Sequence, residues 1–500
     1  MTEEPNETVA PGAWRILGWT SLAVFMTLLD TTILFVAFPS IRASFPSVSA
    51  ANLSWILNAY TIVYAALLVP AGRLADLVGR RRVFLLGVGV FTLGSAACAA
   101  APSPAWIVAG RVFQAAGGAM LTPSSLALVL AGFPRSKRSL AVGLWAAIGA
   151  LAAAVGPSAG SAIIQYGGWR WAFLLNVPIG LAAVVIGKRV LAESRDPDAR
   201  DVPDAVGAIL LMAGIGLLAL GLVRGREWAA PAVLACLAAA LALLALFWVR
   251  SRRVPSPALD VSLFESKSFL FANIATLVFG ATFSAMFLGS VLFLTGVWGY
   301  SILQAGLGMS PGPLLVMAVA PVTGRLGGRL GHRALIVPGG VIFALGFLWR
   351  YLGTSPTPHY VAEWLPPMVL SGIGVGLVLP ALAAASTWSL PPNRFAVGSG
   401  ANQAIRQIGS VLGVGAVVAL AGSAHGPGAL RAFSHVFLLL ALGGLSTALI
   451  AAAIDTRPRA LPAGGGQEET LDGRPHPPAG NHGADGSVSM NCGKRLPGTK

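Results

Sequence analysis

The stretch "GRLADLVGRR" at residues 72–81 returns 252 residues later as "GRLGGRLGHR" at residues 324–333, identical at five of ten positions. Each copy is short, basic and rich in glycine, and each follows a long apolar segment. Two such copies predict a chain built from two related halves, because parallel internal repeats are one plan of membrane transport proteins. The alternative is a chance similarity in a sequence rich in glycine and arginine.

Fourteen apolar segments surround these two copies. The chain of 500 residues is 55% hydrophobic and 11% charged, whereas soluble domains carry about 25% charged residues. Each segment is long enough to cross a hydrocarbon core of about 30 Å as a helix. We place them at residues 15–38, 50–71, 83–101, 105–130, 140–164, 170–187, 205–223, 230–249, 269–295, 303–323, 334–352, 363–387, 399–422 and 433–454.

The two copies follow the second and the tenth segment, so they are shifted by eight segments. Two six-helix halves separated by two extra central helices give this shift. We therefore expect an all-α, polytopic membrane protein of 14 transmembrane helices with a substrate site between its halves. The expected parts are a cytoplasmic N-terminal segment (1–14), an N-terminal half (15–190), a two-helix insertion (204–250), a C-terminal half (268–455) and a disordered cytoplasmic tail (456–500).

The net charge of +15 is distributed in a way that favours a membrane topology over a nucleic-acid partner. If the chain alternates across the bilayer from a cytoplasmic N-terminus, 26 of its 34 basic residues lie on the cytoplasmic side. This asymmetry follows the positive-inside rule and predicts that both termini are cytoplasmic. Two basic residues lie within spans, and the six on the outer side are Arg42, Arg170, Arg224, Arg226, Arg350 and Arg431.

No sequence pattern indicates an enzyme, a metal site or a cofactor. The three cysteines and six histidines have no metal-ligand spacing, and no phosphate-binding G-x-x-x-x-G-K-[ST] motif is present. A membrane enzyme needs convergent acids or histidines, and of the acids only Asp30 lies deep in a span.

Asp30 stands inside "TLLDTTILFVAFP" at residues 27–39. A charge at the centre of a membrane helix costs about 2.5–3.5 kcal/mol on insertion scales, so we expect it to have a function. Arg111, in another span, is the cation that would balance it. The pair either carries the transported proton or is a fixed structural link between helices.

Several motifs together resemble the major facilitator superfamily, in its fourteen-span drug:proton antiporter branch. They are "LDTTILFVAFP" in span 1, "GRLADLVGRRR" after span 2, "GRVFQAAGGA" in span 4 and "GLWAAIGALAAAVGPSAGS" in span 5, with "GWRWAFLLNVPIG" and "SGANQAIRQIGSVLGVG" in later segments. The resemblance covers residues 15–455. Phe35 departs from the branch, which usually has asparagine there, and Ala152 and Ser161 replace glycines.

The resemblance implies a major facilitator fold driven by a proton gradient, with no cofactor. It implies proton coupling at Asp30 and Arg111, and conformational gating by the loop and by span 5. The gating residues are Gly72, Asp76, Gly79, Arg80, Arg81, Gly156, Pro157 and Gly160. From the residues alone, the loop is equally well a basic, topology-setting turn, and the span 5 glycines indicate close helix packing.

Substrate contacts are expected from an aromatic stripe and from polar residues. Phe279, Phe283 and Phe287 recur every four residues on span 9, and if they face a cavity they suit flat, lipophilic ligands, cationic ones included. A stripe of this kind also packs commonly against lipid or core. The polar candidates are Gln114, Asn273, Gln403 and Arg406.

These observations predict a multi-pass plasma-membrane exporter of lipophilic compounds that exchanges them for protons. Its partners are then small molecules, protons and the lipid bilayer. Two alternatives stay open: a proton-coupled facilitator that takes up a polar nutrient, and a non-transporting sensor on the same fold.

Overall fold

The computed structural model describes residues 9–456, except 198, 200, 201, 226, 392, 393, 423 and 425–427. The predicted tail at 456–500 lies, apart from Thr456, outside the described residues. The helices are α1 (Pro11–Ser44), α2 (Ala50–Leu53), α3 (Trp55–Val78), α4 (Arg80–Ala99), α5 (Pro104–Gly132), η1 (Arg135–Lys137), α6 (Arg138–Gly167), α7 (Arg170–Leu174), α8 (Asn176–Val190), α9 (Ala205–Arg224), α10 (Ala230–Ser251), η2 (Val261–Glu265), α11 (Lys267–Gly296), α12 (Ile302–Met309), α13 (Pro311–Leu330), α14 (Arg333–Gly353), η3 (Tyr360–Trp364), α15 (Leu365–Trp388), α16 (Phe395–Ala421) and α17 (Ala429–Ala451).

Fourteen helical segments of the described residues are long and apolar enough to cross a membrane, so the predicted number of spans is confirmed. Most of them extend a few residues beyond the predicted limits, because the amphipathic ends continue the helix. Some spans contain a break. The tenth, Ile302–Leu330, divides into α12 and α13 at Ser310–Pro311, where proline removes a helical hydrogen bond.

Several helices begin at a polar side chain that caps them. The Ser103 hydroxyl accepts a hydrogen bond from Trp106 N at the start of α5. Ser301 and Gln304 form a reciprocal capping box at the start of α12. Such caps satisfy the first backbone N–H groups of a helix, so they define where the spans leave the interface.

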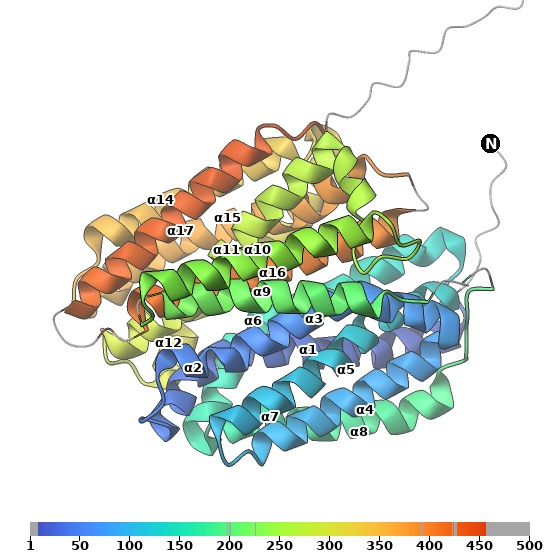
Figure 1. Cartoon of the computed structure of the whole chain (residues 1–500), viewed down its shortest axis with the longest axis horizontal. Coiled ribbons are helices and arrows are strands. Elements are labelled where there is room, and N and C mark those ends of the chain that lie inside the picture. The colour runs from blue at the N-terminus through green and yellow to red at the C-terminus, as the bar shows by residue number, and fades with distance from the viewer. Residues whose placement is uncertain are drawn as a thin grey trace, which may run out of the picture. The chain divides into compact units, whose positions relative to one another are not determined.

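The helices form two halves with an insertion beside both of them. α1–α8 pack on one another, as do α11–α17, while α9 and α10 pack together and α9 contacts both α3 and α16. Figure 1 shows α9 and α10 in green between the blue-to-teal first half and the yellow-to-red second half. The predicted all-α fold of two six-helix halves and two extra helices is confirmed.

The repeat in the sequence is also a repeat in the backbone. Gly79 and Gly331, the eighth residues of the two copies, have φ angles of +129° and +81°, which favour glycine. A Cβ at Gly79 would lie 2.7 Å from the Glu193 carboxylate, and a Cβ at Gly331 would lie 2.7 Å from the Thr456 carbonyl. Each copy therefore turns tightly against the segment that follows the last helix of its own half.

The same interval of 252 residues continues into the following spans. Gly87, Phe91 and Gly94 of α4 precede Gly339, Phe343 and Gly346 of α14 by this interval. A Cβ at Gly94 would lie 2.7 Å from the backbone of α5, and one at Gly346 would lie 2.8 Å from the backbone of α15. Glycine at these positions lets the two helices of each pair approach closely.

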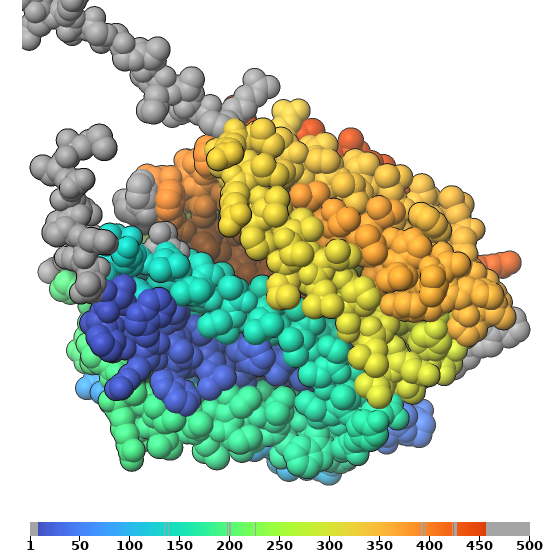
Figure 2. Space-filling view, turned by 180° about the vertical axis from the view of Figure 1, so that it is seen from behind, coloured from blue at the N-terminus to red at the C-terminus, as the bar shows by residue number. Residues whose placement is uncertain are grey.

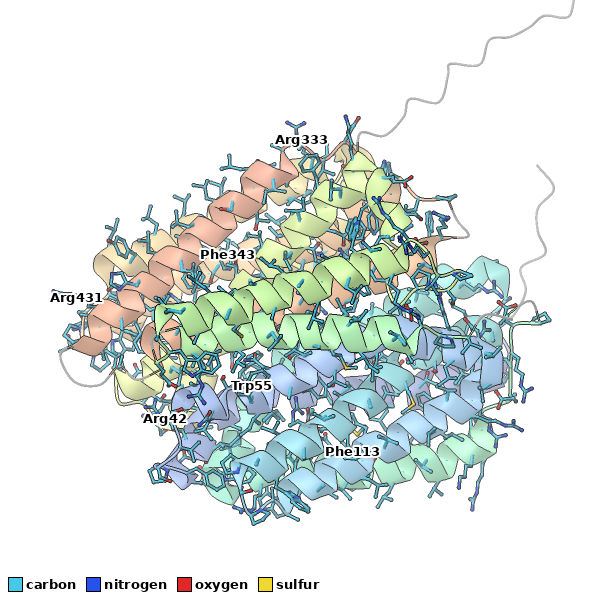
Figure 3. The ribbon with its side chains drawn as sticks, in the orientation of Figure 1. Arg42, Trp55, Phe113, Arg333, Phe343 and Arg431 are labelled. Carbon is cyan, nitrogen blue, oxygen red and sulfur yellow. The ribbon has the colours of Figure 1, made fainter. Side chains whose placement is uncertain are left out.

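Basic side chains mark the two ends of the helix bundle. Figure 3 shows Arg333 at one end and Arg42 and Arg431 at the other. It also shows Phe113 on the outer surface, where its side chain is 66% exposed. Apolar side chains on the outer surface of a bundle with many spans are suited to contact lipid.

Candidate functional site

Asp30 is buried near the middle of α1, with 1% of its surface exposed. Its Oδ2 accepts a hydrogen bond from an Arg111 guanidinium nitrogen at 2.5 Å. Its Oδ1 accepts hydrogen bonds from the side-chain amides of Gln114 and Asn176, both at 2.8 Å. Three donors from α5 and α8 thus face the two oxygens, an arrangement suited to the acceptor-only, ionised form of a carboxylate.

Arg111 of α5 is also 1% exposed and is held on several sides. Its Nε donates a hydrogen bond to the Ile56 carbonyl at 3.1 Å, and its Nη1 donates a second hydrogen bond to Gln114 Oε1 at 2.6 Å. Its Cζ lies 3.8 Å from the centre of the Tyr60 ring. The charge is therefore balanced by Asp30 and further stabilised by a carbonyl and an aromatic face.

Ser95 and Asn176 complete this group, which we call the Asp30 network (Asp30, Tyr60, Ser95, Arg111, Gln114 and Asn176). The Ser95 hydroxyl accepts hydrogen bonds from Gln114 at 2.7 Å and from Asn176 at 3.3 Å. The network connects α1, α3, α4, α5 and α8. A change of charge at Asp30 would therefore alter side-chain contacts among five helices of the first half.

A cavity of about 1010 Å³ lies between the two halves. It is lined by residues of α1, α3, α6, α11, α12, α13, α14, α15 and α16, and it reaches Gly143 near the start of α6 and Gly324 near the end of α13. Figure 2 shows a hollow between the teal α6 and the yellow α13, which diverge toward those ends. The cavity therefore opens toward the side on which α1 begins.

The two halves meet at the other end of the cavity. A Cβ at Gly306 of α12 would meet the Ser161 side chain and the Pro157 carbonyl of α6. The backbone N–H of Leu303 donates a hydrogen bond to Gln165 Oε1 at 3.4 Å. Glycine at position 306 thus permits the close helix contact that closes this end.

The Asp30 network lies behind the wall of the cavity. Tyr60 belongs to both, since its ring contacts Arg111 and also lines the cavity. Of the neighbours of Asp30 on α1, Thr27 and Thr31 line the cavity. Asp30 itself and Arg111 are not part of the lining, so a ligand in the cavity is separated from them by one layer of side chains.

Two of the three stripe phenylalanines line the cavity. Phe283 and Phe287 do so together with Phe35 of α1, and the Phe35 and Phe287 ring centres are 5.9 Å apart. Phe279 does not line it, because its ring is fully buried against Phe343 at 5.3 Å. Phe35 thus supplies an aromatic face where the resemblance leads one to expect an amide.

The polar substrate candidates lie in different surroundings. Gln114 belongs to the Asp30 network, and Asn273 is buried, where its Oδ1 accepts a hydrogen bond from Asn402 at 3.0 Å. Arg406 lines the cavity and donates hydrogen bonds to Gln403 Oε1 at 3.2 and 2.9 Å. Of these four residues, only Arg406 is part of the lining.

The predicted gating residues of the loop pack within the first half, whereas Arg73 of the same segment donates a hydrogen bond to Ser256, which follows α10. Asp76 forms an ion pair with Arg80 at 2.9 Å. The backbone N–H of Arg81 donates a hydrogen bond to Glu193 Oε1 at 3.0 Å, and Arg333, at the matching position of the second copy, donates one to Thr456 Oγ1 at 3.2 Å. A Cβ at Gly72 would be in ordinary contact with Pro123 at 3.4 Å.

The span 5 glycines lie where α6 packs on α1. A Cβ at Gly156 would meet the Thr32 side chain, and one at Gly160 would lie 2.7 Å from Ile33 Cγ1. Pro157, between them, lies inside the helix and faces Gly306 with its carbonyl. The three residues thus lie where α6 contacts both α1 and the second half.

In the sequence analysis, Arg350 is counted among the basic residues on the outer side of the membrane. In the structure, Arg350 lies inside a span. It belongs to the span Arg333–Gly353 and is 1% exposed, so that prediction is wrong. The reason is that Arg350 lies within α14, three residues before its end, with its side chain turned inward, where it lines the cavity.

His332 lies between the spans α13 and α14, within the second copy of the repeat. Its ring packs edge-on against Trp388 at 5.3 Å. Burial lowers the pKa of the His332 imidazole below its usual value of 6.5, because desolvation disfavours the charged form. Within the described residues, no group of three or more His, Cys, Asp and Glu is placed to hold a metal ion.

Comparison with known families and proteins identifies relatives over most of the chain. The model of the Major Facilitator Superfamily matches residues 20–414. The "Cephamycin export protein CmcT" of Amycolatopsis lactamdurans is 36% identical over 453 residues, which cover 88% of this chain and 92% of that protein. The "Multidrug resistance protein Stp" of Mycobacterium tuberculosis is 35% identical over 79% of this chain and 73% of its own length.

Another relative is also named as a resistance protein, and solved transporter structures share the fold. The "Methylenomycin A resistance protein" of Streptomyces coelicolor is 32% identical over 84% of this chain and 89% of its own length. Among solved structures, a bacterial homologue of the human lysosomal transporter Spinster has a TM-score of 0.66 at 16% identity and covers 91% of this chain and all of that one. That likeness concerns the fold alone.

Proposed function

This chain belongs to the Major Facilitator Superfamily, and from that premise we propose that it exports lipophilic small molecules in exchange for protons. It is a transporter and not an enzyme. Export is supported by the relatives, whose names describe export or resistance. Exchange for protons is our proposal from the Asp30 network.

The observation that carries the proposal is a buried carboxylate, hydrogen-bonded at both oxygens, next to a cavity formed by both halves. Asp30 and Arg111 are each 1% exposed, and Tyr60 connects Arg111 to the cavity wall. Ionisable groups within a membrane are functional candidates by default. Here they lie one side chain from the space that a substrate would occupy.

Protonation of Asp30 would weaken the hydrogen bonds that its two oxygens accept. A proton on Oδ2 would place a donor opposite the Arg111 guanidinium, which has only donors, so Arg111 would lose its counter-charge and this hydrogen bond. Gln114 and Asn176 would then donate to the carbonyl oxygen of a neutral carboxyl, which is a weaker acceptor than a carboxylate. Binding of a proton thus weakens the links of α1 to α5 and α8. Release of the proton restores them, which gives two states of the first half that differ by one proton.

Alternating access then consists of a rocking of the halves about the cavity. We propose that the cavity opens to the cytoplasm and that both termini are cytoplasmic, because the basic residues favour that side. In this orientation the contact of Gly306 with Pro157 and Ser161 closes the outer side, and the loop with Asp76 and Arg80 belongs to the cytoplasmic rim. The protein is a multi-pass membrane protein, which we place in the plasma membrane.

The cavity wall indicates the type of compound. Aromatic rings of Phe35, Phe283 and Phe287 face it, and such surfaces hold flat, apolar molecules. The sequence extends the expected substrates to cationic compounds. Among the described residues, however, the lining holds no carboxylate that would pair with a cation.

The test is transport in proteoliposomes of the purified full chain, with an imposed pH gradient, a fluorescent lipophilic dye and an internal pH indicator. We expect dye export that depends on the gradient and a proton flux that depends on the dye. Asp30→Asn should bind dye and lose the coupled proton flux.

The matched control is Asp204→Asn, since Asp204 is also a buried carboxylate paired with an arginine, Arg250, at 2.8 Å, but caps the start of α9. Coupling should survive in this variant. Undiminished coupling in Asp30→Asn would show that the proton is carried elsewhere.

The alternatives give different results in the same assay. A nutrient facilitator would accumulate a polar solute with the gradient and would not export the dye. A sensor would bind the dye without moving it or a proton. Either outcome would contradict export.

A further inference from the structure

Arg350 is a buried cation of the second half without a counter-charge. Its Nη1 donates a long hydrogen bond to Ser290 at 3.4 Å, whereas its Nε and Nη2 have no hydrogen-bond partner. Among the described residues it takes part in no ion pair. Leaving a buried charge without a partner is costly, so this arrangement calls for a reason.

Aromatic rings hold the guanidinium in a defined position. Its Cζ lies 3.7 Å from the centre of the Trp364 ring and 5.0 Å from that of Phe347. Stacking of this kind stabilises an arginine through its face and leaves its edge donors unused. The unused donors, Nε and Nη2, form one edge of the guanidinium, which is the edge that binds a carboxylate through two parallel hydrogen bonds.

The charge of the whole cavity has one sign. Its lining contains two charged residues, Arg350 and Arg406, and no Asp or Glu among the described residues. Arg406 is only partly buried, and its hydrogen-bond partner, Gln403, is neutral. The lining therefore attracts anions and disfavours cations.

Arg350 lies at the closed end of this cavity. The same lining includes Ser290 near the end of α11, Met309 at the end of α12 and Met368 near the start of α15. Because Arg350 is only 1% exposed, a ligand reaches it when neighbouring side chains move. The flexible methionines of this lining are suited to such movement.

We propose that the transported compound is a lipophilic anion whose carboxylate, or a group of similar shape and charge, binds the Nε and Nη2 edge of Arg350. The apolar body of the compound lies against Phe35, Phe283 and Phe287, and Arg406 adds to the attraction at a more accessible position. This inference rests on the proposed export function and specifies its substrate class. It replaces the cationic compounds that the sequence suggested.

The test compares three probes with one ring system: 2-naphthoate, 2-naphthamide and 2-naphthylmethylammonium. Binding to the purified full chain is measured by titration calorimetry for the wild type, Arg350→Gln, Arg350→Lys and Arg431→Gln. We expect the wild type to bind naphthoate at least tenfold more tightly than the other two probes. Arg350→Gln should lose about tenfold in affinity for naphthoate and keep its affinity for naphthamide.

The other two variants separate charge from geometry. Arg350→Lys keeps the charge without the planar edge and should be intermediate. Arg431→Gln removes an exposed arginine of α17 outside the cavity and should match the wild type. If Arg350→Gln does not fold, the order of the three probes in the wild type and in Arg350→Lys decides.

Failure of this inference is distinct from failure of the export function. Equal affinity of the wild type for naphthoate and naphthamide overturns the anion site, whatever is transported. The same holds if folded Arg350→Gln keeps the wild-type affinity for naphthoate. Charge-dependent binding that Arg350→Gln abolishes, without transport in proteoliposomes, supports the anion site and contradicts export.

Discussion

Among the described residues, each half of the molecule buries one arginine almost completely, and the two arginines differ in their hydrogen-bond and charge partners. Arg111 of the first half has an aspartate, a glutamine oxygen and a backbone carbonyl as partners. Arg350 of the second half has one long hydrogen bond and two aromatic rings. Arg111 is therefore neutralised from within the protein, whereas Arg350 keeps its charge available.

The internal repeat makes this difference informative. Arg350 follows Cys98 of α4 by 252 residues, the interval that relates the two loops and the glycines of α4 and α14. The first half thus has a neutral thiol where the second half has a cation. The halves share a framework, and our two proposals give them different tasks: the first half binds the proton, and the second half binds the ligand.

The largest effect is expected from breaking the neutralised pair. Arg111→Gln leaves Asp30 buried without its cation, and loss of one partner of a buried pair costs about 3–5 kcal/mol. Thermal unfolding in detergent should show a marked decrease in stability. The double variant Asp30→Asn/Arg111→Gln should recover part of it, because no unpaired charge remains; a double variant less stable than both singles would contradict the pair.

Removal of the unneutralised arginine should have little effect on stability. Arg350→Gln loses cation–π contacts worth about 2 kcal/mol but also removes the cost of an unpaired buried charge. We expect a net change within about 1 kcal/mol of zero, measured in the same unfolding assay. A decrease as large as that of Arg111→Gln would mean that Arg350 has a partner in the folded protein.

The two loop glycines should behave alike, since here the halves are equivalent. Gly79→Ala and Gly331→Ala each place a Cβ at positive φ and 2.7 Å from a neighbour, which costs about 1–2 kcal/mol for the backbone alone. Gly328→Ala is the control, because a Cβ there meets nothing within 4 Å. Unequal losses in the unfolding assay would show that one loop is more firmly packed than the other.

Asp76→Asn should change transport more than stability. Asp76 and Arg80 are 37% and 23% exposed in their ion pair, and pairs reached by water contribute about 0.2–1 kcal/mol. We expect a several-fold slower turnover with unchanged substrate affinity, measured as initial export rates over a range of substrate concentrations. Wild-type kinetics would leave the loop with its topological role alone.

A small, pH-dependent effect is expected at His332. Because burial lowers the pKa of His332 below 6.5, its neutral form stabilises the fold fully above pH 6.5, and this contribution is lost as the pH falls through 6.5 and below. The melting temperature should therefore fall less between pH 7.5 and 5 in His332→Gln than in the wild type, by the equivalent of about 1 kcal/mol or less. An identical pH profile of the two proteins would contradict a depressed pKa.

The fold could be predicted from the sequence because the signals were long and independent. Fourteen apolar segments, the loop echo and the asymmetry of basic residues all indicate the same arrangement. Asp30, Arg111 and Gln114 were singled out because polar groups are rare at such depth, and the structure brings these three together. Ser95 and Asn176 were missed, since a serine or asparagine in an apolar helix does not by itself indicate which helix it will face.

Helix geometry explains why two other predictions from the sequence, for the phenylalanine stripe and for Arg350, differ from the structure. Phe279, Phe283 and Phe287 are spaced by four residues, and each step turns the side chain by about 40° relative to the last. Over two steps the stripe rotates from the core to the cavity. Arg350 was assigned to the outer side because it lies near the end of an apolar segment, and the sequence does not show whether a side chain in the last turn of a helix points to solvent or to the interior.

The packing of the insertion has a mechanical consequence. α9 and α10 form an apolar cluster with α3 of the first half and α16 of the second, which includes Ile62, Leu211, Phe247, Ala401 and Val411. On this flank the insertion joins the two halves, whereas on the other flank α6 and α13 diverge toward the open end of the cavity (Figure 2). In the orientation that we propose, an amphiphile dissolved in the inner leaflet would therefore reach the cavity sideways, between α6 and α13, without first entering water.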